Sequence, residues 1–532
     1  MSNALRVPIA KTDYFSAIIK DYVAKKPELS TYYNRFPNLE SFKEQISEKG
    51  ANYSLAQRQS LSNALEEQYK KVDTSKEVRE NLRSLRQENT FCITTGHQLN
   101  IFTGPLYFWY KIINAVKLCE DLKRSYPEYN FVPVYWMASE DHDLDEIRFF
   151  NFKGHKLQWN QETGPAVGHL DLSDMEVVLD SFRELLGDSD KAEYLLDLFS
   201  KTYLEQDNLA QAMRFLVNAL FSDLGLVIID GDDKALKKDF SPVMESDLFY
   251  QTGYKAVTNT NTTLSKDYNI QVNPREINLF YLGEKRSRIE RVADKFHVVD
   301  SDAFFTEAEI KQELTDHPER FSPNVILRPL YQEIVLPNLC YIGGGGEIAY
   351  WFELKAMFAE YNTTFPILLL RNSLLVSQKK QLEKASKLGV SLEDLFLKRS
   401  SLIDKMVREY SEHTIDFTEK KDFLKAQFES LYTLAKQTDA SFVGAVAAQE
   451  RKQIKGLENL EKRLLKAEKK RLYERLTRLE HLQEELFPQG TLEERKRNFA
   501  LYYEKYGEDF KTAILEHMSP LAMEFLVLEF DF

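Results

Sequence analysis

Residues 91–98, Phe-Cys-Ile-Thr-Thr-Gly-His-Gln, begin the stretch of sequence that decides the fold. An apolar run of strand length meets a glycine turn there, and a helix-like segment follows from about residue 105 to residue 123. A second apolar run occupies residues 131–137, and a similar alternation returns at 226–230, at 325–342 and at 365–370. Strand, helix and strand in this order predict a βαβ unit, so we expect an α/β core built on a parallel sheet with right-handed crossovers.

The 532 residues are enough for about three domains of roughly 150 residues each. Residues 1–88 are polar with short apolar anchors, and we expect a helical segment that packs on the core. Residues 89–372 carry the strand–helix alternation, interrupted by insertions at about 151–205 and 251–320. Residues 373–532 are rich in helix formers and predict a helical coiled coil followed by further helices.

The coiled-coil prediction depends on leucines that recur every seven residues, namely Leu465, Leu472, Leu479 and Leu486. Residues 451–480 carry eleven basic and five acidic side chains, a local net charge of +6. A nucleic-acid arm is one interpretation of this charge. A solvated flank of the coiled coil is the interpretation that we favour.

Composition excludes several classes of protein. Hydrophobic residues make up 43% of the chain, so general disorder is excluded. Asp and Glu outnumber Lys and Arg by 83 to 70, which argues against a protein that coats nucleic acid or an anionic membrane. No window approaches the roughly 18 to 20 apolar residues that span a bilayer. The three cysteines lie in apolar runs, so we expect free thiols and a cytoplasmic protein without nucleic-acid or membrane partners.

The first candidate site follows the first strand of the predicted sheet. Gly96, His97 and Gln98 stand at its carboxyl end, where open α/β sheets bind ligands, and Thr103 and Gly104 precede the helix. The two glycines allow the backbone to approach a ligand, and the helix N-terminus offers N–H groups to an anion. His97 can donate to a phosphate or carboxylate. An ordinary glycine turn with a capping histidine is the alternative.

An acidic cluster follows the second strand. Residues 140–146 contain five carboxylates and one imidazole, beginning with Glu140, Asp141, His142 and Asp143. Such a cluster suits a cation, an amine or several hydroxyls, and it makes His142 a credible general base for an amine nucleophile. An acidic loop that caps the next helix is the alternative. We predict no metal here.

A third constellation combines Arg328 with four consecutive glycines, Gly343, Gly344, Gly345 and Gly346. Glycines at a strand end suit close approach of a phosphate or sugar, although the spacing does not match a Walker A loop. Arg328 is a natural clamp for a carboxylate. A tight strand–helix turn is the alternative. Asp230 follows another strand and can hold sugar hydroxyls, whereas Lys285, Arg286 and Arg288 are expected to form a solvated loop.

Taken together, these motifs resemble the family of bacillithiol biosynthesis cysteine-adding enzymes. The resemblance rests on Thr-Gly-His-Gln at 95–98, Thr-Gly-Pro-Leu-Tyr at 103–107, Glu-Asp-His-Asp at 140–143, and Arg-Pro at 328–329 with Tyr-Ile-Gly-Gly-Gly-Gly-Glu-Ile-Ala-Tyr-Trp at 341–351. It extends over nearly the whole chain.

The resemblance implies a Rossmann-like core similar to that of class I aminoacyl-tRNA synthetases, a connective insert, and a coiled coil that makes a homodimer. It also implies the addition of L-cysteine to glucosaminyl-malate to form bacillithiol, and it leaves the cofactor open, with ATP or ADP as candidates. On this hypothesis the turn at His97 holds an activating phosphate or the carboxylate, and Arg328 holds the malate. His142, beside Asp141 and Asp143, takes the proton of the amine. A coiled-coil scaffold that binds a nucleotide or sugar without turnover is the competing interpretation.

Overall fold

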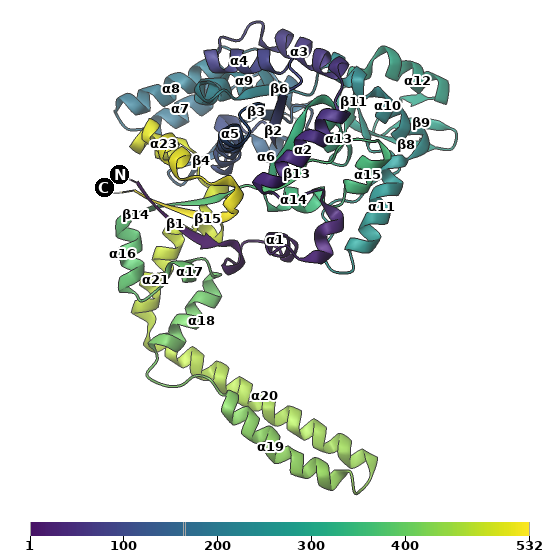
Figure 1. Cartoon of the computed structure of the whole chain (residues 1–532). Coiled ribbons are helices and arrows are strands. Elements are labelled where there is room, and N and C mark those ends of the chain that lie inside the picture. Colours follow the sequence, from purple (N-terminus) through teal and green to yellow (C-terminus); the bar gives the residue numbers. More distant parts are fainter. Residues whose placement is uncertain (1, 163, 165, 531–532) are drawn as a thin grey trace.

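The core of the molecule is a parallel sheet of five strands. The computed structural model describes residues 2–162, 164 and 166–530 (Figure 1). The strands run in the order β13-β12-β2-β3-β6, and every neighbouring pair is parallel. Their bounds are β2 Thr90–His97, β3 Asn130–Met137, β6 Val227–Asp230, β12 Asn338–Gly343 and β13 Ile367–Leu370. The first strand of this sheet along the chain, β2, lies in its middle, so the strand order reverses between β2 and β12. The predicted α/β core is confirmed.

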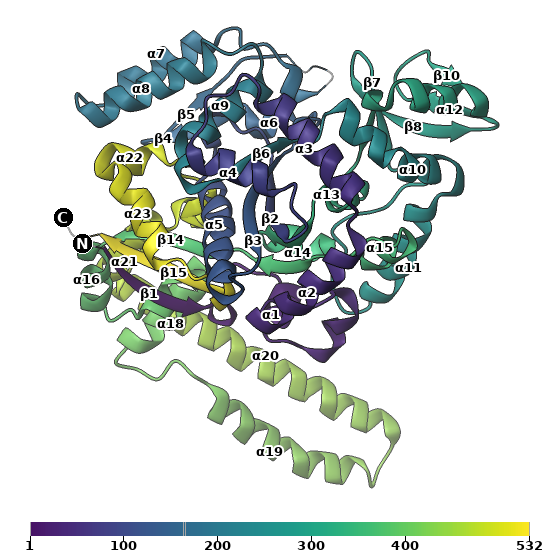
Figure 2. The ribbon, with the colours of Figure 1, turned by 45° about the horizontal axis from the view of Figure 1, so that its top comes forward.

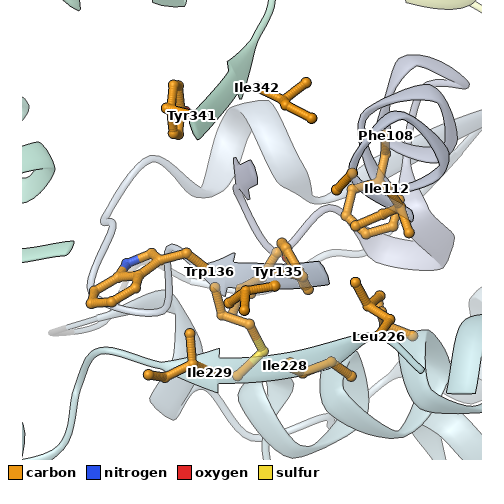
Figure 3. Close-up of a cluster of buried hydrophobic side chains, with 14 of the residues drawn as sticks. Phe108, Ile112, Tyr135, Trp136, Leu226, Ile228, Ile229, Tyr341 and Ile342 are labelled. Atoms are coloured by element: carbon orange, nitrogen blue, oxygen red, sulfur yellow. The ribbon is translucent and has the colours of Figure 1, made fainter. Parts of the chain in front are cut away.

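The sheet is buried because its strands are apolar on both faces. All eight residues of β2 are buried, and α5 (Tyr107–Ser125) packs on β2 and β3. Figure 3 shows Tyr135 and Trp136 of β3 between the isoleucines of β6 and side chains from α5 and β12. Side chains alternate between the faces of a strand, so neighbouring residues such as Tyr135 and Trp136 serve opposite layers of the core.

Two insertions lie on opposite sides of the core (Figure 2). The first contains the hairpin β4–β5 (Phe149–Phe152, His155–Gln158) and the helices α7 (Met175–Leu185) and α8 (Asp190–Tyr203), followed by α9 (Leu209–Phe221). The second carries an antiparallel sheet in the order β10-β9-β8-β7-β11. Its strands are β7 Leu279–Leu282, β8 Arg286–Val292, β9 Lys295–Val298, β10 Phe304–Phe305 and β11 Phe321–Pro323.

Helices fill the remainder of the amino-terminal two thirds. They are α1 Ala17–Val23, α2 Leu39–Asn52, α3 Leu55–Tyr69, α4 Lys76–Ser84, α6 Leu144–Ile147, α10 Lys234–Tyr250, α11 Thr252–Leu264, α12 Glu307–Asp316, α13 Leu327–Val335, α14 Gly345–Trp351 and α15 Lys355–Glu360. Within the described ranges, no helix is both long and apolar enough to cross a bilayer.

A third sheet joins the two ends of the chain. Strand β1 (Ser2–Pro8) pairs antiparallel with β15 (Glu524–Phe530), which pairs parallel with β14 (Ser373–Gln378). The sequence predicts helix in these segments. The structure has strands there instead. They are short, and they are stabilised by pairing with residues far away in the sequence, so local sequence propensity does not predict them.

The carboxy-terminal helices are α16 Lys379–Lys387, α17 Leu392–Leu395, α18 Arg399–Tyr410, α19 Thr418–Ala435, α20 Ala440–Arg471, α21 Tyr473–Leu486, α22 Ala500–Tyr506 and α23 Glu508–His517. Helices α19 and α20 form an antiparallel hairpin that projects from the body of the molecule (Figure 1). The leucine repeat does not follow one helix, because α20 ends before Leu472. Leu479 and Leu486 are buried in α21, where they pack in a second core with Leu402 and Phe525. Leu465 and Leu472 are partly buried against the same core, so all four leucines of the repeat pack within the chain.

Candidate active site

A cavity of about 670 Å³ lies at the carboxyl edge of the parallel sheet. Its floor comes from residues at or just beyond strand ends: 96–98 after β2, 138 and 140–142 after β3, and 344, 346 and 347 after β12. The cavity therefore straddles the point between β2 and β12 where the strand order reverses. Open α/β sheets bind ligands at this position.

The walls of the cavity are strongly basic. Residues 273–288 of the second insertion supply one wall, and Arg371 and Arg495 line the opposite part. Seven basic residues line it, Lys111, Arg275, Arg286, Arg288, Arg328, Arg371 and Arg495, against the three carboxylates of Glu140, Asp141 and Glu347. This excess of positive charge favours an anionic ligand.

Asp141 is a fixed, ionised carboxylate. It accepts hydrogen bonds from Gln98 Nε2 at 2.9 Å and from the backbone N–H of His142 at 2.8 Å. Burial acts to raise its pKa, but hydrogen bonds from His142 and Gln98 outweigh burial and hold the pKa of Asp141 below its usual value. Asp141 therefore suits the binding of an ammonium group better than the removal of a proton.

His142 is engaged through its Nδ1 atom, which lies 3.0 Å from Nη1 of Arg286. A guanidinium only donates, so Nδ1 accepts in the bond to Arg286 and the proton of the neutral ring is then on Nε2. Nδ1 also lies 3.5 Å from Oδ1 of Asp141, to which a ring protonated at Nδ1 donates. The guanidinium of Arg286 stacks on Phe280, 4.0 Å from the ring centroid, and also donates to Pro323 O. The arginine thus occupies the lone pair that a general base would use.

Glu140 belongs to a chain of charges that leads away from the cavity. Its carboxylate lies 2.7 Å from Lys237 Nζ, and the same ammonium lies 2.6 Å from Asp232. Asp232 in turn contacts His169 Nε2 at 2.7 Å. Burial raises the pKa of Glu140, and the charge of Lys237 opposes that rise. Glu140 therefore faces the cavity from a rigid, charge-compensated position.

His97 is a buried, neutral imidazole. Burial lowers its pKa well below the usual value, and the nearby charge of Lys111 lowers it further. The ring packs against Tyr107 and Phe108. Its Nε2 atom has no hydrogen-bond partner among the residues that the structure describes. The ring can supply one N–H or one lone pair to a ligand, but it does not carry a positive charge at neutral pH.

Glu347 connects three elements beneath the glycine turn. Lys111 Nζ of α5 lies 2.6 Å from its carboxylate and donates to Gly96 O at 2.8 Å. Tyr341 OH and the backbone N–H of Gly344 also donate to Glu347, at 2.7 and 2.9 Å. Burial acts to raise the pKa of Glu347, but the charge of Lys111 and these hydrogen-bond donors outweigh burial and lower the pKa to about 2. The ion pair fixes the ends of β2 and β12 relative to each other.

Arg328 is the basic residue best placed to bind a carboxylate. It projects from α13, where Nη2 donates to Tyr350 OH at 3.1 Å and Nη1 to Gln332 at 3.4 Å. No carboxylate of the described chain pairs with it. Gly96 lies directly beside it, since a Cβ added there would be 3.6 Å from Nη1 of Arg328.

Several predicted site residues lie outside the cavity. Asp143 caps α6 by accepting a hydrogen bond from the backbone N–H of Glu146 at 3.4 Å. Helix capping was the alternative to ligand binding that the sequence offered for the acidic cluster. Thr103 is fully buried, and the carbonyl of Gly104 accepts from Asn498 Nδ2 at 2.7 Å. Asp230 accepts hydrogen bonds from Ser139 Oγ and from the backbone N–H of Asp232.

The four glycines also divide between two roles. Gly344 and Gly346 line the cavity. Gly343 packs beneath it, where a Cβ would lie 3.0 Å from Glu347 Cβ, and Gly345 faces Phe15 and Ile19 of the amino-terminal segment. Thr103, Gly104, Asp143, Asp230, Gly343 and Gly345 do not line this cavity, so ligand contact by these residues stays a prediction.

The sequence interpretation missed several cavity residues. Arg286 and Arg288, expected to be solvated, line the wall. Their spacing of two in a strand places both side chains on one face, which is a signal that could have been used. Lys111 interrupts the apolar face of a buried helix, and Arg371 is the first residue after the end of β13. Arg495 is distant in sequence, and its one signal was that Glu493, Arg495 and Asn498 match the pattern of the family that the chain resembles.

No cluster of three or more His, Cys, Asp or Glu in the described parts of the chain could hold a metal ion. A parallel sheet with a basic cavity at the point where its strand order reverses defines the chain as a Rossmann-like α/β protein, with a cavity whose charge suits a small anionic molecule.

Comparison with known families specifies the protein further. Residues 4–372 match the family model described as bacillithiol biosynthesis BshC, N-terminal Rossmann-like domain, and residues 374–530 match its C-terminal coiled-coil domain. The chain therefore belongs to the bacillithiol biosynthesis BshC family. The resemblance inferred from the motifs is confirmed.

Close relatives share this length. A protein of Flavobacterium johnsoniae named "Putative cysteine ligase BshC" is 52% identical over 97% of both chains. A protein of Christiangramia forsetii with the same name is 48% identical over 99% of both. Among solved structures, a chain described as a putative arginyl-tRNA synthetase from Campylobacter jejuni has 11% identity and a TM-score of 0.24, covering 81% of this chain and 93% of that one.

Proposed function

We propose that this protein is a cysteine ligase that joins L-cysteine to glucosaminyl-malate through an amide bond, the last step in forming bacillithiol. Family membership and the names of its relatives support a cysteine ligase. The observation that carries the proposal is one cavity with arginines on its walls and the Glu140–Asp141–His142 loop on its floor. An acidic sugar amine needs both, since its carboxylates pair with arginine and its ammonium pairs with carboxylate.

Amide formation requires the ammonium to lose a proton, after which the amine attacks the activated carboxyl of cysteine and the activating group leaves with the electrons of its bond to that carbon. In the proposed mechanism Asp141 and Glu140 bind the ammonium, and the malate carboxylates bind Arg328 and Arg286. A carboxylate on Arg286 competes with His142 Nδ1 for the same guanidinium, which lies 3.0 Å from that atom. The lone pair of Nδ1 is then free to take the proton of the amine. Acceptor binding would thus activate the base.

The proposal also covers the assembly and the location of the protein. We propose three regions, 1–88, 89–372 and 373–532, and a homodimer formed through the α19–α20 hairpin. Phe423, Leu434 and Leu460 on this hairpin are each more than half exposed, which is unusual for a surface that stays in water. Cytoplasmic location is supported by three buried, unpaired cysteines.

The function is tested in a strain that lacks the gene for this protein. Thiol analysis by mass spectrometry is expected to show accumulated glucosaminyl-malate and no bacillithiol, and the wild-type gene is expected to restore the thiol. His142→Ala should reduce bacillithiol formation by about 100-fold, because general-base catalysis contributes typically 10²–10⁴-fold. His155→Ala, an exposed histidine of β5, is the matched control and should restore the thiol fully.

Two outcomes would contradict the proposal. Unchanged thiols in the deletion strain would exclude the ligase function. Restoration by His142→Ala equal to that by His155→Ala would exclude His142 as the base. Substrate binding by the purified protein without any turnover would favour the scaffold alternative.

A further inference from the structure

Three potential donors surround one aromatic ring in the cavity. The ring of His97 lies 5.2 Å from the ring centroid of Tyr107, and the guanidinium carbons of Arg371 and Arg495 lie 5.3 and 6.0 Å from it. All four side chains line the same cavity. They come from the end of β2, the end of β13, the start of α5 and the carboxy-terminal region, so the fold brings four separate segments to one point.

Two of these groups have buried atoms without partners. Arg371 is 4% exposed, and its Nε has no hydrogen-bond partner in the described chain. The Nε atom is directed toward the cavity beside Gly344, since a Cβ added at that glycine would lie 3.8 Å from it. Nε2 of His97 is likewise buried and unpartnered among the residues described. Buried polar groups are nearly always hydrogen-bonded, so both atoms point to a ligand that completes them.

Glu494 holds this arrangement in place. Its carboxylate accepts from Nη1 and Nη2 of Arg371 at 3.0 and 2.6 Å, which fixes the plane of the guanidinium and leaves Nε for a ligand. It also accepts from Ser373 Oγ and from the backbone N–H of Leu374, both at 3.1 Å. Glu494 therefore fixes the position of the next residue, Arg495, at the mouth of the cavity.

Charge at this point favours an anion. Arg371 is neutralised by Glu494, and Lys111 is neutralised by Glu347, the carboxylate on this side of the cavity. Arg495 makes no ion pair with any described residue, so it contributes an uncompensated positive charge. A compact oxyanion would accept from Nε of Arg371, from Arg495, and from His97 when Nε2 carries the proton of the ring.

We propose that His97, Arg371 and Arg495 form an oxyanion subsite that binds the anionic group of the cysteine donor, its carboxylate or a phosphoryl group attached to it. This assignment rests on the proposed ligase function. It places the donor on the β12–β13 side of the cavity, opposite Glu140 and His142 on the β3 side. The subsite lies between the two parts of the chain that match separate family models, and the carboxy-terminal part supplies one of its arginines.

Isothermal titration calorimetry with the full-length protein tests the subsite directly. L-Cysteine and inorganic phosphate are titrated separately into the wild type, Arg495→Gln and the control Lys470→Gln, an exposed lysine of α20. We expect the affinity for at least one probe to fall tenfold or more in Arg495→Gln and to stay unchanged in Lys470→Gln. A loss for cysteine identifies a carboxylate ligand, and a loss for phosphate identifies a phosphoryl ligand. Arg495 is exposed, so its substitution should not disturb folding.

The subsite is refuted if the wild type binds neither probe, or if Arg495→Gln binds both as tightly as the wild type. Steady-state kinetics adds a second readout. Arg495→Gln should raise the KM for the cysteine donor at least tenfold, leave the KM for glucosaminyl-malate within twofold, and be partly rescued by Arg495→Lys. Equal changes in both KM values would contradict a donor subsite. A wild type that binds a probe through Arg495 but forms no bacillithiol would refute the ligase function and support the subsite.

Discussion

At the scale of single residues, the carboxylate of Glu347 has the largest structural influence on the cavity. It pairs with Lys111, which is almost completely buried, and accepts from Tyr341 and Gly344. These contacts connect the ends of two neighbouring strands with the helix that covers them. A buried ion pair adds little net stability by itself, but loss of one partner leaves the other charge uncompensated.

Glu347→Gln is therefore expected to lower the free energy of unfolding by about 3 kcal/mol, because it leaves the ammonium of Lys111 buried without a counter-charge. Urea unfolding followed by circular dichroism measures the change. The double variant Lys111→Met with Glu347→Gln should recover part of the loss, since it removes both charges. A single variant as stable as the wild type would show that Lys111 finds another partner.

The same carboxylate predicts a dependence of stability on pH. Its folded pKa is about 2, below the ordinary value of 4.5, so its contribution is complete above pH 4.5 and is lost as the pH falls toward 2. Melting temperatures between pH 7 and pH 3 should fall more steeply in the wild type than in Glu347→Gln, which has no group to titrate. Parallel curves would contradict the depressed pKa.

At the scale of elements, the leucine repeat and the projecting hairpin lie in different environments. Leu479 of α21 is fully buried in the second core, whereas the hairpin α19–α20 carries exposed apolar side chains. The helix breaks between α20 and α21 at Leu472, within the repeat itself. The repeat alone did not reveal the break, because a seven-residue spacing is maintained across it.

Leu479→Ala is expected to lower the free energy of unfolding by about 2–5 kcal/mol, because it removes buried methyl groups and leaves a cavity. Tyr473→Ala, on the exposed face of the same helix, is the control and should change stability by less than about 0.5 kcal/mol. Urea denaturation gives both values. Similar effects of the two substitutions would mean that α21 is not packed as described.

Elements also show what the sequence could and could not predict. The strands of the core sheet were predictable because each is an apolar run between turns. Ligands of open α/β sheets bind at the carboxyl ends of the strands, and this rule placed residues 96–98 and 140–142 in one cavity, as the structure has them. Strands β1, β14 and β15 were not, because their partners are distant in sequence. Arg495 and the basic wall were missed for the same reason: side chains from distant segments meet only after the chain folds.

At the scale of the whole molecule, the projecting hairpin determines the proposed assembly. A groove lined by Phe423, Leu424, Leu457 and Leu460 runs along it. The double variant Phe423→Glu with Leu460→Glu should convert a dimer into a monomer of 62.1 kDa, as measured by light scattering after size-exclusion chromatography. Lys470→Gln should remain dimeric. A wild type that is monomeric at micromolar concentration would contradict the dimer.

The sheet that pairs β1 with β15 also has a consequence for protein synthesis. The ribosome makes β1 first, but its neighbour β15 follows only after every other strand described here. During translation, β1 must wait with an unpaired edge while the parallel core can already assemble behind it. Closure of this sheet is then the last event of folding. A nascent chain that stalls before residue 524 would expose the unpaired N–H and C=O groups of β1 and would be expected to bind chaperones.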